Sequence, residues 1–97
     1  MSKTILRLVR LDPEVLFDKE SMALYLKKEL DLPAWFGGNL DALADVLSEI
    51  SEETAFVVEI TSLPAFYAEG RPKKALKVIS RAAQENPHLH LYFEGLF

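Results

Sequence analysis

The chain contains no cysteine, so disulfides and cysteine-ligated metal sites are excluded, which suits a reducing compartment. It also lacks any run of about 18 apolar residues, the length that a membrane-spanning helix needs. The N-terminal segment predicts no signal peptide, because Arg7 and Arg10 interrupt its apolar run. We therefore expect a cytoplasmic protein without disulfides.

Basic residues are missing from the middle of the chain, where no Lys or Arg occurs from Glu29 to Gly70. All 11 basic residues lie outside this span, up to Lys28 and from Arg71 onward. Such a block predicts a surface of one sign, which is either an ordinary solvated face or a binding face. A nucleic-acid-binding face would need the opposite sign. The acids of the span are Glu29, Asp31, Asp41, Asp45, Glu49, Glu52, Glu53, Glu59 and Glu69.

The segments that are present predict a small layered α/β fold. With 97 residues, of which 49% are hydrophobic, the chain is long enough for one domain with a modest core. Strands separated by helices favour a parallel sheet with right-handed crossovers. The expected strands are 4–9, 54–61 and 88–94, and the expected helices are 18–30, 40–50 and 72–86, with a connector at 62–70 that has room for one short helical turn.

Local signals mark the ends of these elements. Asp18 and Asn39 are expected as the N-cap residues of the first two helices. Pro33 forces the first of these helices to end, because the residue before a proline is pushed out of the helical conformation. The nearly unbroken apolar run 54–61 predicts a strand that is covered on both faces. The aromatic pair at 66–67 is expected to complete the core.

The helix expected at 40–50 separates apolar from acidic side chains. Asp41 and Asp45 are neighbours at i and i+4 on the face turned away from the core. Asp41 lies near the helix N-terminus, where the dipole favours a carboxylate, but Asp45 is repelled by Asp41 at a cost of a few tenths of a kcal/mol. This conflict indicates a function, although a solvated helix face explains the pair as well. At about 100° per residue, Leu40, Leu43, Leu47 and Ile50 fall on one side, and Asp41, Asp45, Ser48 and Glu49 on the other.

A loop with two adjacent aromatic residues precedes this helix. Trp35 and Phe36 lie between Pro33 and the pair Gly37 and Gly38. Two adjacent aromatics in a loop are rarely both buried, and an exposed aromatic beside acids is typical of a binding hot spot. The glycines allow a tight turn with positive φ. Together these residues predict an acidic patch with an aromatic shoulder that is displayed to a basic partner.

No catalytic, metal or cofactor site is expected. Paired catalytic carboxylates need different environments, with one acid in an apolar pocket, whereas Asp41 and Asp45 are two exposed acids on one helix turn. The spacing of a calcium loop and the Gly-x-Ser-x-Gly nucleophile motif are missing. His88 and His90 share one strand face and could bind a metal, but histidines at a sheet edge explain them better. The basic side of helix 72–86 fits a solvated face better than a nucleic-acid patch.

The stretch KKELDLPAWFGGNLDALADVLSEI resembles the signature of barstar-type ribonuclease inhibitors. The shared features are a helix that ends in Lys-Lys-Glu-Leu, a proline after it, an aromatic pair, and Gly-x-Asn-Leu-Asp-Ala-Leu followed by a second Asp. The match is dense over residues 27–47, and elsewhere it rests on the order of the elements. The resemblance implies a barstar-like α/β fold over residues 1–97, a single layered domain with a three-stranded parallel sheet packed with three to four helices.

The resemblance also implies an inhibitor, not an enzyme, that binds a small basic, barnase-like ribonuclease stoichiometrically and is a monomer when free. Asp45 would be the central acid that imitates a substrate phosphate, Asp41 would flank it, and Trp35 stands where the family has a contacting tyrosine. Neither nucleic acid nor membrane would be bound directly. The expected contact residues are Trp35, Phe36, Gly37, Gly38, Asn39, Asp41, Ala44, Asp45, Ser48 and Glu49.

Three positions depart from the family pattern. Ala44 stands where the family often has a tryptophan, and Gly38 stands where a polar residue is usual. Arg81 aligns with a glutamate that contacts the nuclease in the best-known member. These departures support an alternative, a barstar-like interaction module whose partner is not a nuclease. A small hydrolase that uses the two aspartates is a third hypothesis.

Overall fold

The computed structural model describes residues 4–95. The three strands form one parallel sheet in the order β1-β2-β3, which confirms the predicted fold class. The elements are β1 (Arg7–Arg10), α1 (Pro13–Leu16), α2 (Lys19–Leu30), α3 (Leu40–Ser48), β2 (Thr54–Glu59), the 3-10 helix η1 (Ile60–Ser62), α4 (Leu63–Tyr67), α5 (Arg71–Glu85) and β3 (Leu89–Glu94).

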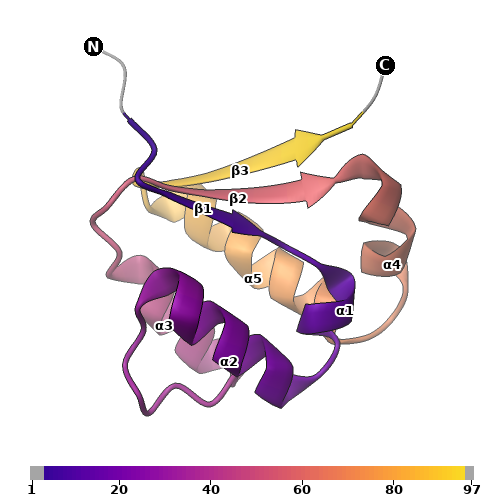
Figure 1. Cartoon of the computed structure of the whole chain (residues 1–97), viewed down its shortest axis with the longest axis horizontal. Helices are drawn as coiled ribbons and strands as arrows, with labels where there is room; N and C mark the ends of the chain where they lie inside the picture. The colour runs from indigo at the N-terminus through magenta and orange to yellow at the C-terminus, as the bar shows by residue number, and fades with distance from the viewer. Residues whose placement is uncertain (1–3, 96–97) are drawn as a thin grey trace.

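The helices α1, α2, α3 and α5 all lie on one side of the sheet (Figure 1). Both crossovers step in the same direction across the sheet, and right-handed crossovers of this kind place their helices on the same face. The main core forms between this face and the helices. Val9, Phe56 and Leu91, which are neighbours in register, belong to it.

Within residues 4–95 the other face of the sheet carries no helix (Figure 1), but the first five residues of β2 are buried, which confirms the expectation that this strand is covered on both faces. Ala55 and Val57 of the central strand are buried on this face all the same. Their neighbours in the edge strands are exposed instead, Leu8 at 56% and Tyr92 at 50%. A central strand can therefore be buried by the side chains that flank it.

Both predicted N-caps are confirmed. The Asp18 carboxylate accepts a hydrogen bond of 3.0 Å from the Ser21 N–H. The Asn39 side-chain oxygen accepts bonds from the N–H groups of Asp41, at 2.7 Å, and Ala42, at 3.3 Å. These bonds satisfy donors that have no partner inside the helix.

Apart from shifts of a few residues at the ends of elements, such as β1 at Arg7–Arg10 in place of 4–9, two local features differ from the prediction. The one-turn helix α1, which has Asp12 as its N-cap and Pro13 in its first turn, was not predicted. Phe66 is buried as expected, but Tyr67 is 71% exposed. Adjacent residues on a helix point about 100° apart, so only one of this pair reaches the core. Within residues 4–95 no helix is long and apolar enough to cross a membrane.

Candidate functional site

α3 turns its apolar residues inward and its acids outward. Leu43 and Leu47 are fully buried, whereas Asp41, Ala44 and Asp45 are exposed. The cap at the start of the helix places Asp41 in the first turn, where the dipole favours its carboxylate. The helix therefore displays two acids one turn apart, with the small side chain of Ala44 exposed beside them.

The end of α3 is polar as well. Ser48 and Glu49 are both exposed. The Ser48 hydroxyl donates a hydrogen bond of 2.6 Å to the Asp45 carbonyl. Its proton is therefore engaged by the helix backbone, while its oxygen can still accept a bond from a partner.

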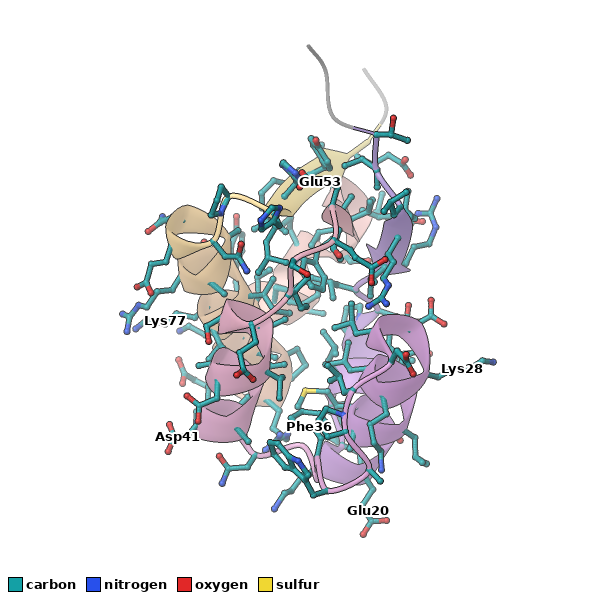
Figure 2. All side chains as sticks on the ribbon, turned by 90° about the vertical axis from the view of Figure 1, so that its left-hand side faces the viewer. Glu20, Lys28, Phe36, Asp41, Glu53 and Lys77 are labelled. Carbon is teal, nitrogen blue, oxygen red and sulfur yellow. The ribbon has the colours of Figure 1, made fainter. Side chains whose placement is uncertain are left out.

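The two aromatics of the preceding loop lie in opposite environments. Trp35 is 66% exposed, and Phe36 is 0% exposed, pointing between α2 and α3 (Figure 2). Phe36 therefore presents no surface to a partner, in contrast to the expectation that it is a contact residue. Gly37 and Asn39 are exposed, but Gly38 is buried and offers a partner little surface.

Gly38 turns the loop where it passes α2. Its φ is +90°, a conformation that L side chains rarely adopt. A Cβ at this position would lie 2.5 Å from the Lys19 carbonyl oxygen. The Gly38 carbonyl accepts a hydrogen bond from Nη2 of Arg71, the first residue of α5. The turn thus needs a glycine and is held from two other elements.

Polar contacts from α5 hold both ends of α3. Arg71 binds the loop before α3, and Asn86, directly after α5, is buried against the end of α3. Nδ2 of Asn86 donates to the carbonyls of Leu47, at 2.9 Å, and Ile50, at 3.0 Å. The two helices therefore run in the same direction, with the acidic face of α3 held in a fixed position.

A groove of about 470 Å³ lies between α3 and α5. Asp41, Ala44 and Ser48 line it from α3, and Lys77 and Arg81 line it from α5. Asp41 and Lys77 point out to the same side of the molecule (Figure 2). The α3 wall is acidic, and the α5 wall carries the two basic residues together with Glu85 at the end of the helix.

Sequence patterns did not reveal Arg71 and Asn86 as residues that position α3, because each acts on a carbonyl group 33 or more residues away. The position of Asn86, between a helix and Pro87, was the only local signal. Lys77 and Arg81 were visible as a basic helix side, but nothing in their spacing placed them beside Asp41.

His90 of β3 and His88, which directly precedes this strand, contact a carboxylate that the sequence did not indicate. Glu53 accepts or shares hydrogen bonds with Nδ1 of His88, at 2.6 Å, and Nε2 of His90, at 2.7 Å. Each ring nitrogen thus faces a carboxylate oxygen directly. No group of three or more potential ligands suited to a metal occurs among the residues that the structure describes.

A comparison with known families adds a decisive observation. The family model described as Barstar (barnase inhibitor) matches residues 6–94. The chain belongs to the barstar family. The barstar match extends from the start of β1 to the end of β3, so it includes the loop, α3 and α5. Barstar-family proteins are inhibitors rather than enzymes. No curated protein matches the chain.

Proposed function

We propose that this barstar-family chain is a cytoplasmic inhibitor that binds a small basic ribonuclease stoichiometrically and blocks its active site, without catalysis of its own. Residues 1–97 act as one domain, monomeric when free. The observation that carries the proposal is the outward display of Asp41 and Asp45 on one positioned helix, beside the exposed Trp35. Neither acid forms an ion pair within residues 4–95.

The mechanism is electrostatic imitation of the substrate. Asp45 takes the place of an RNA phosphate among the basic side chains of the nuclease, and Asp41 contacts the rim of the cleft. Because α3 is held at both ends, little conformational freedom is lost on binding. The proposed contact residues are Trp35, Gly37, Asn39, Asp41, Ala44, Asp45, Ser48 and Glu49, supported from beneath by Phe36 and Gly38.

Asp45→Ala should weaken inhibition strongly and leave the fold intact. Truncating one member of a buried charge pair at an interface costs about 2–5 kcal/mol, a range taken over from interfaces that include the barnase–barstar complex itself. This corresponds to an increase in Kd of about 30-fold to several thousand-fold. The measurement is a titration of ribonuclease activity with parent and variant, with circular dichroism to check folding.

The matched control is Glu14→Ala, which removes one exposed acid from the first turn of α1. This variant changes the net charge by the same amount. It should change inhibition less than about threefold, because a distant charge contributes only weakly to electrostatic steering. Equal inhibition by the parent and Asp45→Ala would exclude Asp45 as the central acid.

A panel of small microbial ribonucleases, each titrated with the protein, tests the proposal as a whole. The basic wall that Lys77 and Arg81 add to the surface favours one alternative, a barstar-like module with a non-nuclease partner. The absence of inhibition across the panel, together with capture of a non-nuclease protein that Asp45→Ala fails to capture, would support that alternative.

A further inference from the structure

The groove between α3 and α5 brings charges of opposite sign together without pairing them. Asp41 lines the α3 wall, and Lys77 and Arg81 line the α5 wall together with one acid, Glu85, at its C-terminal end. No ion pair bridges the two walls within the described part of the chain. The charged groups on both walls thus remain available to a partner.

Other basic residues of α5 are engaged differently. Lys73, outside the groove, pairs with Glu69 at 2.7 Å, and this hydrogen bond lowers the pKa of Glu69. Arg71 is bound to the Gly38 carbonyl. Lys77 and Arg81 form no ion pair in residues 4–95, although they line the same groove as Asp41.

The groove also offers an apolar floor. Leu40 and Ala44 from α3, and Val78 and Ala82 from α5, line it between the charged walls. Charged hydrogen bonds above an apolar floor are stronger than in open water, and a guanidinium binds a carboxylate in a bidentate, oriented way. The small side chain of Ala44 leaves the space open.

We propose that this groove receives an acidic side chain from a surface loop of the ribonuclease, with Arg81 and Lys77 as its specificity-determining partners. The inference rests on the proposed function. A uniformly basic partner surface would be repelled by these two residues, since like charges brought together at an interface are costly. The partner must therefore change sign beside its basic cleft. A carboxylate carries one charge and its plane matches the guanidinium of Arg81, whereas the higher charge of a phosphate would be repelled more strongly by Asp41 on the facing wall.

The direction in which a charge reversal changes binding distinguishes a specific pairing in the groove from general electrostatic steering. Lys74→Glu is the matched control, because Lys74 is exposed on α5 but does not line the groove. By making the chain more acidic, this variant should raise the on-rate toward a basic ribonuclease about twofold. Arg81→Glu makes the same change in net charge, yet it should weaken binding about tenfold through a faster off-rate. Lys77→Glu should weaken binding to a smaller extent.

Surface plasmon resonance with the ribonuclease inhibited by the parent chain gives both rates. If Arg81→Glu and Lys77→Glu tighten binding as Lys74→Glu does, the inference is overturned, while a loss of binding by Asp45→Ala would still support the proposed function. If no ribonuclease binds the parent chain, both the proposed function and the inference about the groove are contradicted.

A second pair of measurements does not depend on charge reversal. Ala44→Trp, at an exposed position, should fill the groove and weaken binding about tenfold, so tighter binding would show that nothing enters. Double-mutant cycles between Arg81→Ala and alanine variants of the partner's acidic residues should give one strongly non-additive pair. Additivity at every acidic position would overturn the assignment.

Discussion

Gly38 links the backbone conformation of one residue to the shape of the whole binding surface. The loop must turn from the buried Phe36 to the N-cap Asn39, and it makes this turn with a φ of +90° at Gly38, against the backbone of Lys19. The sequence predicted that the two adjacent aromatics are not both buried, and the family resemblance placed Trp35 at a contacting position. The turn decides this, because it directs Phe36 inward and leaves Trp35 outside.

Gly38→Ala should destabilise the protein by about 1–3 kcal/mol, because the new methyl group meets a backbone oxygen and the residue is held at positive φ. Gly37→Ala is the matched control, since a Cβ there meets nothing within 4 Å, and it should be neutral or slightly stabilising. Urea unfolding monitored by Trp35 fluorescence measures both. Equal stability of the two variants would show that the turn relaxes without cost.

At the scale of elements, α3 depends on α5 for its position. The apolar stripe of α3 predicted which side is buried, and Leu43 and Leu47 confirm it. The stripe could not predict the contacts at the two ends of the helix, because Arg71 and Asn86 lie far along the chain. Polar groups at the ends of α3 are thus satisfied by side chains from another element, which fixes the helix along its axis.

Asn86→Ala should destabilise the protein by about 2–4 kcal/mol. The substitution leaves the carbonyls of Leu47 and Ile50, and the His88 N–H, without the side chain that binds them. Gln84→Ala, at an exposed position near the same end of α5, should cost less than about 0.5 kcal/mol. Denaturant unfolding gives both values.

Hydrogen exchange provides a second measurement for the same contact. Amide protons near the end of α3 should exchange faster in Asn86→Ala than global destabilisation alone explains. Uniform acceleration across all elements would instead show that Asn86 stabilises the fold without a particular role at α3.

At the scale of the molecule, the sequence predicted what depends on local pattern. The strand and helix order, both N-caps and the outward acids of α3 follow from periodicity and capping within a few residues. The contacts that position the site do not, since they join residues 33 apart for Arg71 and Gly38 and 39 apart for Asn86 and Leu47. Such pairs meet because the crossovers bring distant segments together, and the local sequence of one segment does not specify this arrangement.

The uneven distribution of charge along the chain leads to a prediction about association kinetics. The net charge is −4, and no basic residue occurs from Glu29 to Gly70, the span that contains α3. The on-rate toward a basic ribonuclease should therefore fall about tenfold or more between roughly 0.05 and 0.5 M salt, because the Debye length shortens severalfold. The off-rate should change far less, since close pairs are screened weakly.

Stopped-flow association of the parent chain, Asp45→Asn and Glu14→Gln would locate the source of this steering. Both variants raise the net charge by one, but Asp45 lies on the proposed contact surface and Glu14 lies on α1. If the local field steers the encounter, Asp45→Asn should lower the on-rate at low salt more than Glu14→Gln does. Equal effects would assign the steering to net charge alone, and an on-rate independent of salt would contradict electrostatic steering by this surface.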